Sequence, residues 1–272
     1  MQICHPNVNA TISSNTLFHF TSSIDHIRSI LEDEFRPHFS LEDLSCIEPA
    51  GMKVAIPMVS FCDIRLSQTR SHMGYYGSYG IGLSKSWGIK NRVSPVLYTY
   101  QGSPLTASLN HCIMWAFKKY TDLNHSPYGN LEKIDLEKEL VQQWERLFRV
   151  VCFLKPYEGA LQRPGQPSQD VRFYDEREWR FVPELDGDLF DYVLFEENYS
   201  KPTVRSKADQ KIQQARIPFE PSDIKYIIVL HHEEILPMIK VIEEIKGARY
   251  EGDPIKLLCS KIICADNVAE DF

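Results

Sequence analysis

The sequence predicts an α+β fold with a mixed or antiparallel central sheet and flanking helices. Short apolar runs at residues 17–21, 56–64 and 224–230 are typical of strands. Apolar residues at helical spacing instead dominate about 105–155. A length of 272 residues permits one large domain or two small ones. We expect a single domain, 1–272, with a helical insertion at about 105–155.

The composition is that of an ordinary globular protein, with 43% hydrophobic and 25% charged residues. The net charge is −7 and no long Lys/Arg stripe is present, so duplex nucleic-acid binding is not favoured. No stretch approaches the ~18 apolar residues of a membrane span. Seven scattered cysteines without a CxxC pair, and no preceding signal peptide, indicate reduced thiols. We therefore expect a cytoplasmic protein without membrane contact or a metal site.

The first predicted strand, residues 17–21, runs directly into a helix that Ser22 can cap, with Asp25 three residues on. His19 is a polar side chain in this strand and lies near the junction, where a ligand could reach it. The alternative is a core histidine that is satisfied by a hydrogen bond, which is the commoner outcome. Both interpretations remain open from the sequence.

A surface excursion is expected at residues 32–55, which are polar and contain prolines. The strand expected at 56–64 places Ser60 where it approaches a ligand beside His19 or bonds to the backbone. Next, residues 74–85 combine tyrosines with glycines and predict a loop and strand. Tyr79 in this segment either stacks on a planar ligand or fills the side of a glycine-rich bend.

A charged stretch at residues 173–181 is the strongest candidate for a site. As a strand it would place Tyr174, Glu176, Glu178 and Arg180 on one face. Two neighbouring carboxylates cost free energy unless cations, hydrogen bonds or a ligand compensate them. The alternative is a ladder of Arg and Glu on an exposed sheet edge, which protects against aggregation.

Several segments together carry a resemblance to a known family: residues 17–21, 59–64, 76–83, 95–96, 155–159, 175–180 and 261–263. In these segments the chain resembles the AbiGi family, a bacterial family associated with abortive phage resistance and labelled as an antitoxin. The resemblance runs over most of the chain. It implies a defence role beside a nucleotidyltransferase-like toxin and supplies no chemical mechanism.

A more distant resemblance is to the ADP-ribosyltransferase fold, in which a first strand carries His or Arg for the ribose of NAD. A middle element of that fold carries Ser or Tyr, and a late strand carries the catalytic Glu. By this resemblance His19 would anchor the ribose, and Ser60 or Tyr79 would support the nicotinamide side. Thr21, in the same strand as His19, is grouped with these NAD-binding candidates.

The same resemblance implies that Glu178 is catalytic and that Glu176 is the first residue of an ExE pair. Cleavage of the nicotinamide bond builds positive charge on the ribose, which a carboxylate bonded to a ribose hydroxyl stabilises. Glu176 would orient an acceptor nucleophile or accept its proton. Arg177 or Arg180 would meet the NAD phosphates or, more simply, pair with Glu176, Glu178 or Asp175. No metal is required for this chemistry.

The function expected from the sequence is that of a component of an abortive infection or toxin–antitoxin system. Its ADP-ribosyltransferase-like core would bind NAD and transfer ADP-ribose to a macromolecular acceptor. The alternative is an inactive antitoxin that neutralises a cognate nucleotidyltransferase-like toxin by protein contact. A regulator that binds nucleic acid is least favoured, because the chain is acidic.

Overall fold

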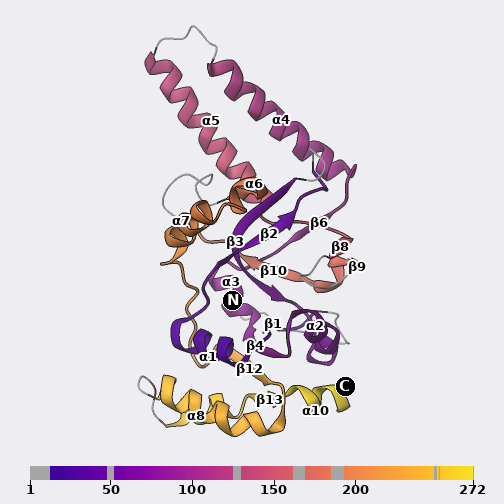
Figure 1. Ribbon diagram of the computed structural model, residues 1–272, viewed down its shortest axis with the longest axis vertical. Helices are drawn as coiled ribbons and strands as arrows, with labels where there is room; N and C mark the ends of the chain where they lie inside the picture. Colours follow the sequence, from indigo (N-terminus) through magenta and orange to yellow (C-terminus); the bar gives the residue numbers. More distant parts are fainter. Residues whose placement is uncertain are drawn as a thin grey trace, which may run out of the picture.

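A computed structural model describes residues 13–47, 52–124, 130–161, 169–184, 193–247, 250 and 252–271. Within these residues, one nine-stranded sheet organises the fold (Figure 1). Its strands are β1 (Thr16–Thr21), β2 (His38–Asp43), β3 (Lys53–Cys62), β4 (Tyr79–Ser84), β5 (Ser94–Pro95), β10 (Glu178–Phe181), β11 (Leu194–Phe195), β12 (Ile224–Val229) and β13 (Ile262–Cys264).

The strand order is β13-β12-β4-β1-β3-β10-β5, with β2 and β11 also paired to β3. The pair β12 and β13 is parallel, and the other strand pairs of this sheet are antiparallel. The predicted α+β class with a mixed central sheet is therefore confirmed.

The long strand β3 connects two parts of the sheet. Its first half pairs with β2 and β11, and its last residues pair with β10. On the other side, its ladder with β1 consists of one pair, Phe18 opposite Cys62. Because this ladder is so short, the residues of β1 after Phe18 form no regular ladder with β3. His19, a residue of the site described below, is the first of them.

Helices cover both faces of the sheet because alternate strand residues are apolar on each side. Leu17 and Ile81 face one core, against α1 (Ile24–Asp33), α3 (Lys85–Lys90), α8 (Ile235–Lys246) and α9 (Asp253–Cys259). Phe18 and Ile228 face the other side, where they pack near α2 (Thr69–Tyr76) and α10 (Ala265–Asp271).

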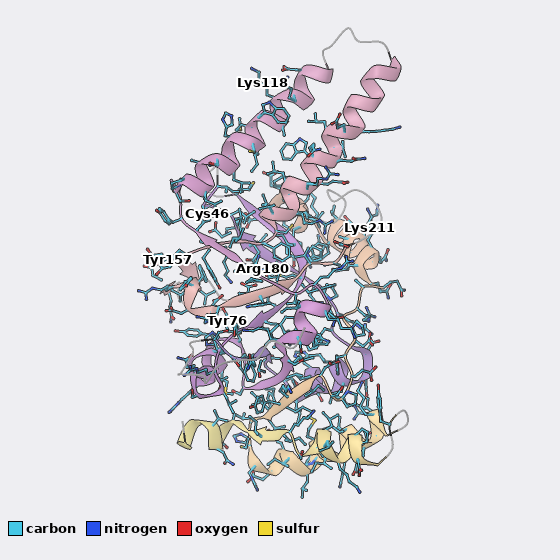
Figure 2. All side chains as sticks on the ribbon, turned by 180° about the vertical axis from the view of Figure 1, so that it is seen from behind. Cys46, Tyr76, Lys118, Tyr157, Arg180 and Lys211 are labelled. Atoms are coloured by element: carbon cyan, nitrogen blue, oxygen red, sulfur yellow. The ribbon has the colours of Figure 1, made fainter. Side chains whose placement is uncertain are left out.

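Two long helices, α4 (Pro104–Asn124) and α5 (Asn130–Val151), form a hairpin that extends away from the sheet (Figure 1). Its base packs on the sheet through Leu109, Phe148 and Val151, which cluster with Val54 and Ile56 of β3. Figure 2 places Lys118 near the outer end of the hairpin and Arg180 in the body of the molecule.

The hairpin base is closed by a parallel pair, β6 (Leu97–Thr99) with β7 (Leu154–Pro156). A second small pair, β8 (Gly159–Leu161) with β9 (Gln169–Val171), follows directly. The short helices α6 (Glu196–Tyr199) and α7 (Pro202–Ile212) follow β11 in sequence and pack beside β3 and β11 (Figure 1). Among the described residues, no helix is both long enough and apolar enough to cross a membrane.

The expectation of a surface excursion at 32–55 is wrong. This segment contains β2, which pairs along its full length with β3. Leu44 and Ile47 that follow are buried against the base of the hairpin. A smaller correction concerns the first helix, where Ser23 rather than Ser22 accepts a hydrogen bond from the Asp25 amide at 3.1 Å.

The strand predicted at 173–181 is only half correct. Residues Phe173–Glu176 form a 3-10 turn, and Arg177 is left-handed with φ of 47°. The strand begins at Glu178, so Tyr174 does not share its face and is exposed. The alternative of an exposed edge ladder is also wrong, because β10 lies between β3 and β5 and Arg180 is 0% exposed.

Candidate functional site

Strand β10 is an inner strand of the sheet, and its side chains Glu178 and Arg180 are buried on one face of it. Glu178 is opposite Cys62, and Arg180 is opposite Ser60. The backbone N–H of Glu178 donates a hydrogen bond to the hydroxyl oxygen of Tyr98 at 2.8 Å. The left-handed Arg177 is held by its own Nε, which donates to the carbonyl oxygen of Asp63 at 2.9 Å. These bonds fix the direction in which Glu178 enters the site.

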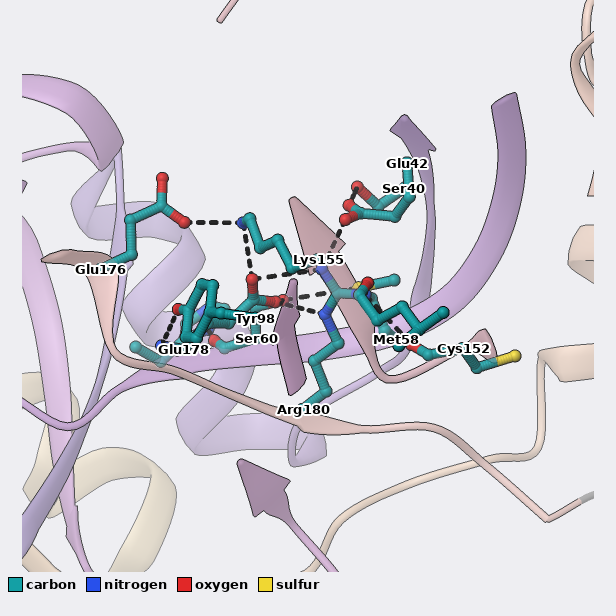
Figure 3. A network of polar contacts seen from close by, with 12 residues as sticks. Ser40, Glu42, Met58, Ser60, Tyr98, Cys152, Lys155, Glu176, Glu178 and Arg180 are labelled. Atoms are coloured by element: carbon teal, nitrogen blue, oxygen red, sulfur yellow. Dashed lines mark hydrogen bonds and ion pairs between the residues drawn. The ribbon is translucent and has the colours of Figure 1, made fainter. Parts of the chain in front are cut away.

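Glu178 is 6% exposed and accepts four hydrogen bonds from three neighbours (Figure 3). Its Oε1 accepts from Ser60 Oγ at 2.8 Å and from Arg180 Nε at 2.6 Å. Its Oε2 accepts from Lys155 Nζ at 2.6 Å and from Arg180 Nη2 at 3.2 Å. An ionised carboxylate offers about four acceptor positions. The donors of the protein itself therefore occupy the acceptor capacity of Glu178.

The remaining donors of Arg180 are also paired. Nη2 contacts the Glu42 carboxylate on β2, and Nη1 donates to the carbonyl oxygen of Cys152 at 3.0 Å. The guanidinium thus joins β10 to β2 and to the end of α5. The simpler expectation for Arg180, pairing with carboxylates, is what the structure shows.

Lys155 joins the two glutamates of the predicted pair. Its Nζ lies 2.6 Å from Glu176 Oε2 and 2.6 Å from Glu178 Oε2. Glu176 also accepts from the hydroxyl of Tyr76 on α2. Although Glu176 is on a 3-10 turn and Glu178 on a strand, both carboxylates reach the same ammonium group. The compensation that two adjacent carboxylates require therefore comes from a lysine.

The protonation states follow from these contacts. Burial alone would raise the pKa of Glu178, but the charges and hydrogen bonds of Arg180 and Lys155 outweigh burial and lower it. Burial alone would lower the pKa of Lys155, yet the charges of Glu178 and Glu176 raise it. The pKa of Arg180 is likewise raised against burial by Glu178 and Glu42. These groups stay ionised at neutral pH.

His19 lies at the short junction between β1 and β3. Its Nδ1 is 2.9 Å from the carbonyl oxygen of Ser60, which can only accept, so Nδ1 carries the proton. Burial lowers the pKa of His19, partly opposed by this bond. The ring contacts Phe35 edge-on, with centroids 5.3 Å apart. His19 is therefore a neutral, hydrogen-bonded histidine whose Nε2 is an acceptor.

A cavity of about 300 Å³ opens beside this network. Four of the predicted site residues line it together: His19, Ser60, Glu176 and Glu178. It is next to a larger groove of about 680 Å³, since both are lined by His19, Ser40 and Ser60. The other residues lining the smaller cavity are Phe20, Ser40, Glu42, Phe61, Cys62, Tyr76 and Lys155.

The two other predicted residues do not line the smaller cavity, although Thr21 shares the larger groove with His19 and Ser60. Thr21 lines the larger groove, where its hydroxyl is 2.7 Å from His26 Nδ1. The Tyr79 hydroxyl donates to Glu234 at 2.8 Å, and Tyr79 is not among the described residues that line either cavity. Its ring packs against the main core, in agreement with the structural interpretation of the glycine-rich segment. In the described part of the chain, no group of three His, Cys, Asp or Glu residues is placed to hold a metal ion.

Sequence reasoning missed Lys155 and Glu42. The helical insertion expected at about 105–155 would end at Lys155, but this residue lies on β7, which pairs with β6. The available signal was a single cation directly after the apolar residues 150–154. Glu42 has no such signal, since it is one of several polar residues in β2 and nothing in the sequence distinguishes it from them.

Comparison with known proteins gives one consistent result. Residues 47–230 match a family described as "Putative abortive phage resistance protein AbiGi, antitoxin". A protein of Lactococcus lactis subsp. cremoris, named "Abortive phage resistance protein AbiGi", is 29% identical over an alignment of 234 residues that covers 80% of this chain and 89% of the relative. No solved structure matches the chain. The matched range contains Ser60, Lys155, Glu176, Glu178 and Arg180.

Proposed function

The chain belongs to the AbiGi family of abortive phage resistance proteins, and we propose that it acts in phage defence as an antitoxin that neutralises a partner toxin by protein contact. The family description names an antitoxin, and the relative is named for abortive phage resistance. Neither name supplies a mechanism, so the choice between protein contact and catalysis rests on the site.

The choice of protein contact over catalysis rests on one observation: protein donors already occupy the hydrogen-bond acceptor positions of the Glu178 carboxylate. A glutamate that stabilises a developing charge on a ribose needs an oxygen that can accept from a ribose hydroxyl. Both oxygens of Glu178 already accept two hydrogen bonds, from Ser60, Lys155 and Arg180. A ligand hydroxyl would have to displace one of these charge-assisted hydrogen bonds, and such bonds are stronger than those between neutral groups. The surroundings of Glu178 therefore fit a structural anchor and do not fit the catalytic role predicted for it with NAD.

A second candidate, the predicted ADP-ribosyltransferase activity, is favoured by a different observation. His19, Ser60, Glu176 and Glu178 come from distant segments and line one cavity. Of the two glutamates, Glu176 is the more accessible, with 15% of its side chain exposed. If a reaction takes place in this cavity, Glu176 is the carboxylate that can contact a substrate without breaking the ion pair between Glu178 and Arg180.

One experiment separates the two candidates. The protein is co-expressed with candidate toxins encoded by neighbouring genes, and the purified protein is incubated with labelled NAD. The antitoxin proposal expects growth to be rescued equally by the wild type and by Glu176→Gln, with no NAD consumed. Glu197→Gln, an exposed glutamate on α6, is the matched control. NAD consumption by the wild type and the control that is lost in Glu176→Gln would establish the second candidate instead.

A further inference from the structure

A long segment of this protein carries no charge. Residues 93–117 contain no Lys, Arg, Asp or Glu, although 25% of the chain is charged. The segment includes β6 and the first two thirds of α4. An uncharged stretch of this length is expected for a buried element. In this molecule, however, much of it belongs to a hairpin that extends from the body (Figure 1).

The helix α4 buries only one side. Leu109 and Ala116 are buried, and Ile113 packs against the same cluster at the hairpin base. The opposite side is exposed and uncharged. We call it the outer face of α4; it consists of Ala107, Ser108, His111, Cys112, Met114 and Trp115.

The outer face has the composition of a protein interface. Met114 is 60% exposed and Trp115 is 52% exposed. Trp and Met are enriched in interface cores, where charged residues are depleted, and Trp is among the residue types enriched at positions that dominate binding energy. A Trp and a Met exposed side by side on an uncharged helix face are costly to leave in water. We infer that the outer face of α4 is the surface through which this protein binds its partner toxin, an inference that rests on the proposed function.

The charges at the end of this face indicate the chemistry of the partner. Lys118 and Lys119 are exposed and follow Trp115 by one turn of the helix. In a parallel pair of two α4 helices these lysines would lie against their own copies. In an antiparallel pair that covers the whole face they would meet the helix N-terminus near Pro104, which is the positive end of the helix dipole. Self-association is unfavourable in both arrangements.

A different protein avoids this repulsion if carboxylates surround its apolar surface. The occupant is therefore a toxin with an apolar groove or patch whose rim, at the end that receives Lys118 and Lys119, is acidic. Complementary rim charges of this kind mainly raise the association rate and fix the orientation.

The test measures binding of the purified protein to the toxin that it neutralises in the co-expression experiment. Trp115→Ala is expected to weaken the Kd by about tenfold or more, as for a central aromatic. Lys119→Glu is expected to lower kon and to reduce its dependence on salt. The control is Leu236→Ala, since Leu236 is 70% exposed on α8, at the other end of the molecule. Its Kd should equal that of the wild type.

The outcomes are distinguishable. Wild-type binding that Trp115→Ala and Met114→Ala leave unchanged would overturn the outer face as the binding surface and leave the antitoxin function standing. Absence of binding and of neutralisation by the wild type would overturn both. In sedimentation velocity, the wild type alone should not form a dimer through the outer face of α4. A wild-type dimer that dissociates in Trp115→Ala would overturn the choice of a toxin as the occupant.

Discussion

Two regions of this molecule reverse the usual distribution of residues. The interior around Glu178 contains three carboxylates and two cations: Glu42, Glu176, Glu178, Lys155 and Arg180. The outer face of α4 is exposed and has no charge. Charged residues are rarely buried unless they are paired, and exposed apolar side chains are unremarkable only when they are scattered. The free-energy cost of the buried charges, and that of the exposed apolar side chains, must therefore each be offset by favourable contacts.

The difference lies in where the compensation comes from. In the interior it comes from the same chain, since every charge of the network contacts an opposite charge or a carbonyl oxygen. The outer face of α4 is uncharged, and none of its residues belongs to the cluster that packs the hairpin base, so we expect a partner protein to cover it. Substitutions should accordingly affect folding in the first region and binding in the second.

The largest expected effect is that of Arg180→Met. This change leaves Glu178 and Glu42 buried without their shared cation and leaves the Cys152 carbonyl without its donor. Removal of one member of a buried ion pair costs about 3–5 kcal/mol. Urea unfolding at neutral pH measures the free energy directly. Arg146→Met, at an exposed position on α5, is the control and should change it by less than about 0.5 kcal/mol. Equal stabilities of the two variants would show that the network is not structural.

A smaller effect with a defined pH dependence is expected for Glu178→Gln. The amide keeps the shape of the carboxylate but weakens three charge-assisted contacts, at a cost of about 1–3 kcal/mol. Because the pKa of Glu178 is lowered in the folded state from its ordinary value of 4.5, its charge stabilises the fold above that value. This stabilisation is lost as pH falls through the folded pKa.

The measurement is urea unfolding of the wild type and of Glu178→Gln across a range of pH. The difference in free energy should be constant from about pH 8 to 5.5 and should shrink below about 4.5. A difference that instead grows on acidification would contradict a carboxylate held ionised by Arg180 and Lys155.

The two regions also differ in how far the sequence predicts them. The strands near residues 17–21 and 224–230 and the helical block are predictable because short apolar runs and helical spacing are local features of the sequence. His19, Ser60 and Glu178 were singled out, and the structure brings them to one cavity. Their partners were not predictable in the same way.

Lys155 and Glu42 reach the site through pairings between distant segments. Glu42 arrives because β2 pairs with β3, within a segment that we expected to be a surface excursion. Lys155 reaches the site because β7, which follows the helical hairpin in sequence, pairs with β6, which precedes it. The left-handed Arg177, which ends the 3-10 turn, also has no sequence signature, since a non-glycine residue rarely adopts positive φ.

The smallest expected effect on stability is that of Trp115→Ala. Since about half of this side chain is already exposed, the free energy of unfolding should change by about 0.5 kcal/mol or less. The matched contrast is Trp87→Ala on α3, where the indole is 2% exposed and donates to the Pro218 carbonyl at 2.8 Å. That variant should lose about 3–5 kcal/mol, as is usual for a buried Trp. Urea unfolding of both variants gives the comparison. A large loss in Trp115→Ala would mean that its ring stabilises the hairpin itself, and the reason to assign it to a partner would disappear.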